Sequence, residues 1–473
     1  MVAASGSSTD PSTPESIRLP AAPAAAPPAP APTAAESVTP PIPPTDSPTP
    51  AATNPIPEPP APTKPPTPLG HNRDFTLLWS GQAVSDLGSQ MSVICYPLLV
   101  LAATGSAGKA GFVGGSQLIA TLLTLLPAGV VADRYPRKRI LIITSLVQMV
   151  AVGSVVPFVL AHHIYLPHLM AVGAIQGSAS AFYIGASRGA LRRIVTSAQL
   201  PSATALTQAR GQAATMAGPP IGGALFGLAR ALPFGFDSVS FGAIAIAAGL
   251  MRSSLDPVRD PAAVREPMRR AVGRGLRFVF AEPFLRVFAL WAAAVNSIAA
   301  GMMLMVIVFA RVRGADPPEV GALLSASALC GLAGSLFGPR LAARLGSRTW
   351  VMITSWLLPT CAVGIAFAPW VWLIAVLGAV TTFTIMPVNV VFLVRAARIT
   401  PDDLQAQASN ARQLVGSSLS WLAPPTFGYL TDTLGPRAAI LIAAALYGAT
   451  AVWLQFNREM FKLDDKDAPD GYA

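Results

Sequence analysis

Asp86 is the residue whose type and position point most directly to chemistry. It lies eleven residues into an apolar stretch at about 75–103, a depth of about 16 Å if the stretch is a helix rising 1.5 Å per residue. An ionisable side chain near the middle of a membrane costs at least about 2.5–3.5 kcal/mol, so such residues usually serve a function. We expect Asp86 to accept a proton or to bind a cationic substrate. The alternative is a structural carboxyl group that hydrogen-bonds small polar neighbours such as Ser85 or Ser89.

Three further charged residues lie in or beside apolar stretches. Arg210 and Arg412 each lie about two helical turns from one end of their stretch. Either could pair with Asp86 or Asp133, or could extend its charge to the lipid interface. Asp237 opens another stretch, where we expect it to cap the positive end of a helix.

The elements that carry these residues are predicted from composition and hydropathy. Of 473 residues, 52% are apolar and only 12% are charged, and the mean hydropathy is +0.52. Soluble domains contain about 25% charged residues, so a soluble globular protein is excluded. We predict an all-α membrane protein with twelve transmembrane helices, at about 75–103, 111–132, 139–160, 166–187, 203–229, 234–251, 285–310, 319–338, 349–368, 370–394, 405–430 and 437–456.

The distribution of basic residues predicts the orientation. Of the 33 Lys and Arg residues, 26 lie before, after or in alternate loops between the predicted spans. Lys and Arg are retained on the cytoplasmic side, so both termini are expected there. The residues before the first span include 22 of the 46 prolines and are expected to be disordered. The predicted domains are a Pro/Ala-rich tail (1–70), two six-helix bundles (71–251 and 285–457), a basic cytoplasmic linker (252–284) and a cytoplasmic C-terminal tail (458–473).

The two predicted bundles carry matching motifs. The segment 128–134, Ala-Gly-Val-Val-Ala-Asp-Arg, is matched 210 residues later by 338–344, Gly-Pro-Arg-Leu-Ala-Ala-Arg. The segment 218–223, Gly-Pro-Pro-Ile-Gly-Gly, is matched 205 residues later by 423–428, Ala-Pro-Pro-Thr-Phe-Gly. Two matches at nearly equal offsets indicate a duplicated six-helix unit, which is typical of transporters that bind substrate between their halves.

The loop after the second span carries a family motif. It reads Gly129-x3-Asp133-Arg134-x2-Arg137-Lys138-Arg139 and resembles the loop signature of the major facilitator superfamily, with Pro136 where that signature usually has glycine. The resemblance covers about 73–456 and implies the superfamily's fold of two six-helix bundles. Three further segments resemble the branch of drug and siderophore exporters, including enterobactin-exporter-like proteins: Arg73-Asp74-Phe75-x3-Trp79-x-Gly81-Gln82, Thr104-Gly105-Ser106 and Asp237-Ser238-Val239-Ser240-Phe241.

The resemblance implies a gate at the cytoplasmic side. Asp133 would face the positive N-terminal end of the eleventh span, and basic residues of the motif could pair with the acidic residues that begin that span. In the second bundle Ala343 replaces this aspartate, so the acidic gate is one-sided. The alternative is a solvated basic loop that only sets topology. The candidates are Gly129, Asp133, Arg134, Arg137 and Lys138 in the motif and Asp402 and Asp403 at the start of the eleventh span.

A second motif resembles one associated with proton-coupled exporters, and it reads Gly218-Pro219-x2-Gly222-Gly223. Glycines at this spacing let two helices approach backbone to backbone, and proline bends a helix. Ordinary tight packing is the alternative. Gly173 stands where the family usually has an arginine that is linked to proton coupling, and this departure weakens the proton-antiport prediction.

The resemblance also implies a central cavity between the first, fourth, seventh and tenth spans. Its candidate lining mixes neutral polar and apolar groups, which suits amphipathic molecules, although each residue could equally serve helix packing. We predict a secondary active transporter that exports small drug-like or siderophore-like amphipathic molecules by alternating access with proton coupling. The candidates are Gln82, Asp86, Gln90, Gln176, Tyr183, Asn296, Met303 and Asn389.

Other classes remain as alternatives. An importer, a lipid flippase, or a sensor or scaffold without proton coupling would share the fold. An enzyme is not expected, because the one histidine cluster, His162-His163-x4-His168, is joined by no cysteine or carboxylate. We predict no cofactor and no metal. The expected partners are membrane lipids, a small-molecule substrate and a candidate proton, without nucleic acid, and the chain is expected to be a monomer. The resemblance implies a multi-pass protein of the bacterial inner (plasma) membrane.

Overall fold

The computed structural model describes residues 68–253, 255, 268–402 and 404–457. Contacts divide the chain into Met1–Lys64 and Pro65–Ala473, and every described residue belongs to the second unit. The predicted disorder of residues 1–67 and the predicted tail at 458–473 lie outside the described residues.

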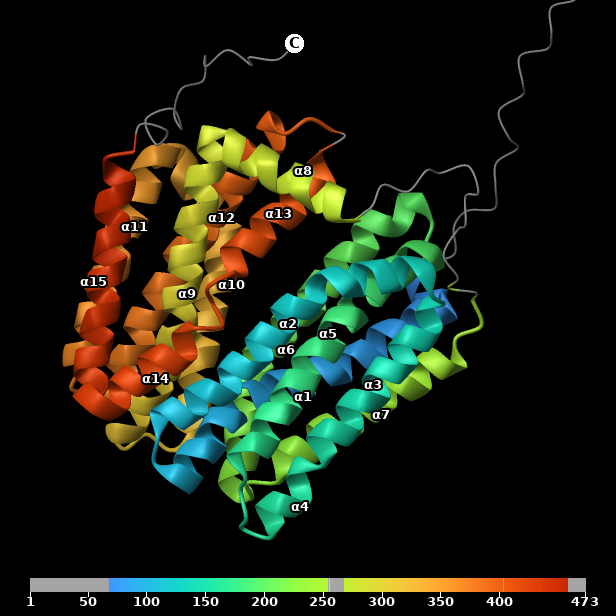
Figure 1. The fold of residues 1–473 in the computed structure, drawn as a ribbon, viewed down its shortest axis with the longest axis horizontal. Helices are drawn as coiled ribbons and strands as arrows, with labels where there is room; N and C mark the ends of the chain where they lie inside the picture. Colours follow the sequence, from blue (N-terminus) through green and yellow to red (C-terminus); the bar gives the residue numbers. More distant parts are fainter. Residues whose placement is uncertain (1–67, 254, 256–267, 403, 458–473) are drawn as a thin grey trace, which may run out of the picture. The chain divides into compact units, whose positions relative to one another are not determined.

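The predicted first bundle is formed by α1 to α7, coloured blue to green in Figure 1. Within it α1 packs against α6 and α7, and α5 packs against α2 and α3. The third predicted span is made of two helices, because α3 ends at Gly153 and α4 begins at Val155. The helices are α1 (Arg73–Thr104), α2 (Ala107–Arg134), α3 (Arg137–Gly153), α4 (Val155–Leu160), α5 (Leu166–Ile194), α6 (Leu200–Leu228) and α7 (Leu232–Leu250), with short 3-10 turns at Leu69–His71 and Ser197–Gln199.

The second bundle is formed by α9 to α15, coloured yellow to red in Figure 1. Here α10 packs against α12, α11 packs against α12 and α15, and α9 packs against α13 and α14. The helices are α9 (Pro283–Val312), α10 (Pro317–Leu345), α11 (Ser347–Phe367), α12 (Val371–Ile399), α13 (Gln405–Ser417), α14 (Ala423–Leu434) and α15 (Pro436–Gln455).

Ten of the described helical segments are long and apolar enough to cross a membrane. The fifth predicted span, α6, is long enough but carries polar side chains along its first half. The eleventh, predicted as one helix over 405–430, is instead two helices, α13 and α14, separated by turns at 418–422. Pro424 and Pro425 in the first turn of α14 lack the N–H groups that a continuous helix would need.

Part of the predicted linker folds as a helix, α8 (Met268–Ala281). It is amphipathic, with Val279 buried and Arg274 and Arg277 exposed. Gly275 lets α8 approach α13 closely, because a Cβ atom there would stand only 2.5 Å from the backbone oxygen of Gln407. The predicted linker therefore contains a helix that is packed against the second bundle over this stretch.

Candidate substrate and coupling site

Asp86 is paired with an arginine from a different helix. Arg210 of α6 donates from Nε to Asp86 Oδ2 of α1 over 2.9 Å. The Arg210 side chain is only 9% exposed, whereas that of Asp86 is 34% exposed. One of the pairings expected for Arg210 is thereby confirmed, and an extension of Arg210 to the lipid interface is excluded in this conformation.

A polar network extends from this pair toward α5. Arg210 also donates to the side-chain oxygen of Gln82, and Gln82 donates to Ser187 Oγ over 2.5 Å. The hydroxyl of Tyr183 belongs to the same helix as Ser187, four residues before it. Among the described residues it has no hydrogen-bond partner within the usual limits, although it is buried. The network therefore links α1, α5 and α6 and retains one unused hydroxyl group.

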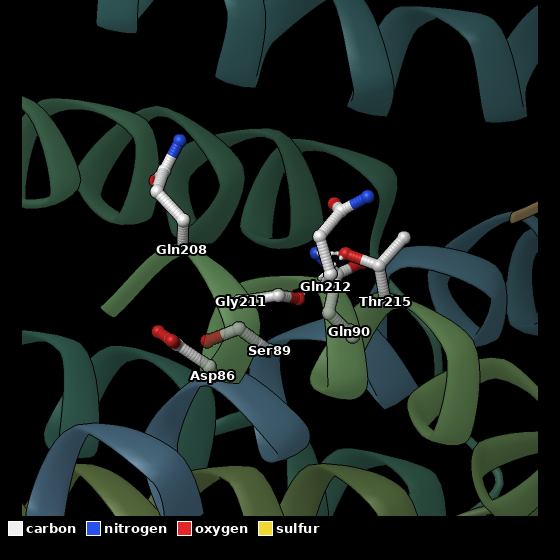
Figure 2. Close-up of a pocket in the computed structure, with 7 residues that line it drawn as sticks. All are labelled: Asp86, Ser89, Gln90, Gln208, Gly211, Gln212 and Thr215. Carbon is white, nitrogen blue, oxygen red and sulfur yellow. Dashed lines mark hydrogen bonds between the residues drawn. The ribbon is translucent and has the colours of Figure 1, made fainter. Parts of the chain in front are cut away.

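Asp86 lines a cavity of about 340 Å³ between α1 and α6 (Figure 2). Every lining residue is polar or glycine, in contrast to the mixed lining predicted from the sequence. Gln90 donates from its side-chain amide to Thr215 Oγ1 over 3.2 Å across the cavity wall. The lining residues are Asp86, Ser89, Gln90, Gln208, Gly211, Gln212 and Thr215.

The α6 side of this cavity was missed by sequence reasoning. Gln208, Gln212 and Thr215 recur at spacings of four and three residues, so they share one face of the helix. That recurrence of polar residues in a stretch otherwise read as a membrane span is the signal that could have found them. A cavity-facing strip on α6 also accounts for its low hydropathy.

Four other residues predicted to line the cavity lie elsewhere. Asn296 on α9 donates to the backbone oxygen of Gly416 on α13 over 3.2 Å, and Gln176 on α5 is buried with its Oε1 unpaired among the described residues. Met303 and Asn389 are exposed. None of the four lines the cavity that contains Asp86.

Two crossings between glycine and proline join the bundles. Where α6 crosses α10, a methyl group on Gly321 would collide with the carbonyl oxygen of Pro219. Where α2 crosses α14, a methyl group on Gly111 would collide with the carbonyl oxygen of Pro424. The glycines are 210 residues apart and the prolines 205, the offsets of the repeated motifs, so the internal duplication relates the two crossings. We call the end of the bundles that holds them the crossing end.

The motif at 218–223 uses two faces of α6. Gly218 packs on the backbone of Gln90 and Gly222 on that of Met91, so both face α1 in the same bundle. Pro219 and Gly223 face α10 in the other bundle, with Gly223 against Pro317. The predicted close backbone approach of helices at this motif is confirmed.

Comparisons with known proteins agree with this architecture. The sequence model of the transmembrane secretion effector family (MFS_3) matches residues 63–470. The chain belongs to this major facilitator family. It is therefore a multi-pass membrane transporter of small molecules rather than an enzyme.

Two multidrug efflux pumps are similar to this chain over nearly their whole length. The transporter is 26% identical over 392 residues to the multidrug efflux pump Tap of Mycolicibacterium fortuitum, covering 79% of this chain and 93% of that protein. It is 26% identical over 413 residues to Tap of Mycobacterium tuberculosis H37Rv, covering 82% and 95%.

Solved structures show the same fold at low identity. The nucleoside transporter NupG aligns with a TM-score of 0.66 at 14% identity, covering 82% of this chain and 99% of that one. An inward-facing bacterial homologue of the lysosomal transporter Spinster aligns with a TM-score of 0.63 at 14% identity, covering 83% and 97%.

The predicted cytoplasmic gate is not formed in this transporter among the described residues. Arg137 donates to the backbone oxygen of Gly189 over 3.3 Å, and Lys138 donates to that of Met251 over 2.8 Å, both within the first bundle. Neither forms an ion pair with Asp402, and Arg134 is exposed. The reason is geometric, since the bundles meet at the crossing end, a full helix length from this motif. Gly129 lies within α2, and the side chains of Asp133 and Asp403 lie outside the described residues.

Arg412 of the transporter differs from Arg210. Its Nε is buried and has no hydrogen-bond partner among the described residues, and no described carboxylate pairs with it. In the second bundle the position that matches Asp86, 210 residues later, is Asn296. An uncharged amide at this position cannot form an ion pair with Arg412. Of the alternatives for Arg412, pairing with Asp86 is excluded in this conformation, because Arg210 bonds that carboxylate. Pairing with Asp133 stays a prediction, because the Asp133 side chain lies outside the described residues.

Asp432, which sequence reasoning missed, ties the two bundles of the transporter together. From the end of α14 it accepts hydrogen bonds from Ser106 Oγ (2.6 Å), Ala107 N (2.7 Å) and Gly108 N (2.9 Å). These residues begin α2, so the carboxylate caps a helix of the opposite bundle. An acidic group is unfavourable at the C-terminal end of its own helix, where the helix dipole is negative. The position of Asp432 in the last turn of α14 was therefore a signal in the sequence that its carboxylate has a partner outside that helix.

Asp237 does not cap a helix, contrary to prediction. The helix α7 begins at Leu232, so Asp237 lies in its second turn and is fully buried. It accepts from Ser92 Oγ over 2.6 Å and from Ser89 Oγ over 3.4 Å. Asp237 therefore joins α7 to α1. One of its two α1 partners, Ser89, also lines the cavity that contains Asp86.

Proposed function

We propose that this transporter exports small amphipathic molecules, drug-like or siderophore-like, from the cytoplasm by alternating access, driven by protons. The multidrug efflux pumps similar to it are aligned over nearly their whole length, which supports export of drugs. The positive-inside distribution of its arginines supports a bacterial inner membrane protein with both termini in the cytoplasm.

Alternating access is supported by the one-ended contact between the bundles. Glycines at the crossings, such as Gly111 and Gly321, bring backbones together at the crossing end. At the opposite end Arg137 and Lys138 bond only within the first bundle among the interactions of the described residues. In the proposed orientation the crossing end is external, so this conformation corresponds to an inward-facing state. Opening to the outside would require the crossings and the Asp432 cap to separate.

Proton coupling is carried by one observation, the Asp86–Arg210 ion pair at the wall of a polar cavity. A proton on Asp86 removes the charge that holds Arg210, and a cationic substrate group would compete with Arg210 for the same carboxylate. Binding of either would therefore weaken the attachment of α1 to α6. A carboxylate that has accepted a proton no longer carries the negative charge that attracts a cationic substrate. Proton and cationic substrate would therefore bind to Asp86 in alternation, as antiport requires.

The test is export of a lipophilic cationic dye from proteoliposomes under an imposed pH gradient. Wild-type protein is expected to export dye. Asp86→Asn is expected to lose the response to the gradient, and its exchange of dye down the dye's own gradient should need a higher dye concentration, because the carboxylate that attracts the cation is gone. Asp316→Asn, which neutralises a carboxylate outside the cavity, serves as the matched control. Gradient-driven export by Asp86→Asn at the wild-type rate would refute the coupling role. Dye movement only inward would indicate an importer, and no dye movement in any form would favour a sensor or scaffold.

A further inference from the structure

A second cavity, of about 270 Å³, opens at the arginine-rich end of the second bundle. It lies between the end of α10, the start of α11 and the end of α12. Two lining residues are arginines, and no carboxylate is among them. The lining residues are Ala342, Ala343, Ser347, Val390, Val391, Val394, Arg395 and Arg398.

The duplication explains why this cavity has positive charge without a matching acid. Ala343 lies 210 residues after Asp133, and Arg398 lies 210 residues after Arg188. The first bundle therefore has a carboxylate in this region of its sequence, whereas the second bundle has a methyl group. Among the described residues, no carboxylate forms an ion pair with Arg395 or Arg398.

The two arginines are placed to act together. They are three residues apart on α12, so they project from the same face of the helix. The guanidinium of Arg395 lies 5.7 Å from the centre of the Phe284 ring, a cation–π distance that restrains its position. Guanidinium groups on one helix face suit the paired oxygens of a phosphate. The first N–H groups of α11, which has no side-chain cap, add donors beside Ser347.

The remaining wall of the cavity is apolar. Val390, Val391 and Val394 provide it, and Leu393 and Leu341 nearby are exposed, by 56% and 37%. A free phosphate would leave this surface without a partner. A phosphate attached to hydrocarbon chains would use both walls, as in basic pockets between membrane helices that hold lipid head groups.

We infer that this cavity binds the phosphate of an anionic phospholipid, with Arg395 and Arg398 on the head group and the three valines against its acyl chains. The site is separate from the Asp86 cavity and depends only on residence in a membrane. Bound lipid would pack the ends of α10, α11 and α12 together at the end that must move during transport.

The experiment measures binding of phosphatidylglycerol to the purified full-length transporter by native mass spectrometry, with phosphatidylcholine for comparison. Arg395→Gln/Arg398→Gln is expected to weaken phosphatidylglycerol binding by at least about tenfold, the effect of losing charge-assisted hydrogen bonds. Arg340→Gln, an exposed arginine on α10 that does not line the cavity, should leave it within about twofold.

A second variant guards against a folding defect in the double substitution. Ala343→Asp places in the cavity the carboxylate that the first bundle has, and it should weaken phosphatidylglycerol binding while the protein stays monodisperse. Undiminished binding in both cavity variants would overturn the proposal. Competition by millimolar inorganic phosphate would assign the site to a free anion instead. Equal binding of phosphatidylcholine, whose phosphate is balanced by a choline cation, would show that the site does not select anionic lipids and would overturn the proposal.

Discussion

Arg210 donates to Asp86 over 2.9 Å across the interface of α1 and α6, with the arginine far more buried than the carboxylate. This asymmetry has a consequence for ligand exchange. A proton or a cation can reach Asp86 from the cavity, whereas Arg210 cannot easily leave for solvent. A ligand that displaces Arg210 from Asp86 therefore has one of two effects. Either the Arg210 guanidinium stays buried, with Gln82 as its remaining partner among the described residues, or α6 moves and carries Arg210 away.

Removing one member of this pair should destabilise the protein more than removing both. Asp86→Ala leaves Arg210 buried without its counter-ion, at an expected cost of about 2 kcal/mol in the free energy of unfolding, after allowance for the exposure of Asp86. The double variant Asp86→Ala/Arg210→Met should recover at least half of that loss. Thermal unfolding in detergent measures both, with Ser80→Ala, an exposed residue of α1, as the control. Additive losses in the double variant would contradict the pairing.

Glycines at the bundle crossings should be intolerant of any side chain. In Gly111→Ala or Gly321→Ala the new methyl group would overlap a proline carbonyl oxygen of the other bundle. We expect the crossing end to be held open and transport to fall at least about tenfold, since a steric overlap of this kind costs about 1–3 kcal/mol. Distances between spin labels on Lys109→Cys, at the start of α2, and Thr433→Cys, at the end of α14, would measure the separation of the two bundles at the crossing end.

Gly114→Ala is the matched control for these variants. Its methyl group would meet only Pro424 Cβ at 3.9 Å, an ordinary contact. We expect nearly wild-type distances and transport. If Gly111→Ala and Gly114→Ala behave alike, the crossings do not govern closure.

Asp432→Asn should loosen the closed crossing end without unfolding either bundle. The amide retains one acceptor but loses the charge that faces three donors at the start of α2. We expect the open population at this end to rise about tenfold, the effect of losing one charge-assisted hydrogen bond. The same spin-label pair measures it. Asp316→Asn alters a residue at the start of α10, whose N–H is bonded to Glu319 of the same helix, and it should leave the distances unchanged.

Topology gives an independent prediction. Reporter fusions at the N-terminus, at the C-terminus and within 256–267 should all be active on the cytoplasmic side, because Lys and Arg concentrate near these positions. A fusion after Arg313, in the short connection between α9 and α10, should report the opposite side. Termini on different sides would mean an odd number of crossings and would contradict the twelve-span fold.

Much of the fold could be predicted because membrane helices are local features. Apolar length alone located α1, α9 and α15, and two repeated motifs revealed the duplication that relates Gly111 to Gly321. The break between α13 and α14 was missed, although Pro424 and Pro425 carried the signal, since the average hydropathy of 405–430 hides a polar first half and a turn.

The sites were less predictable, because they depend on how helices are rotated against one another. By itself the sequence determined that Asp86 is a charge inside a span, since depth follows from position along a helix. Only the tertiary structure decided that Arg210 rather than Arg412 is its partner and that Asp432 joins the bundles. Contacts between residues more than a hundred positions apart depend on helix packing and on which end of the bundles is closed, and no local pattern encodes either.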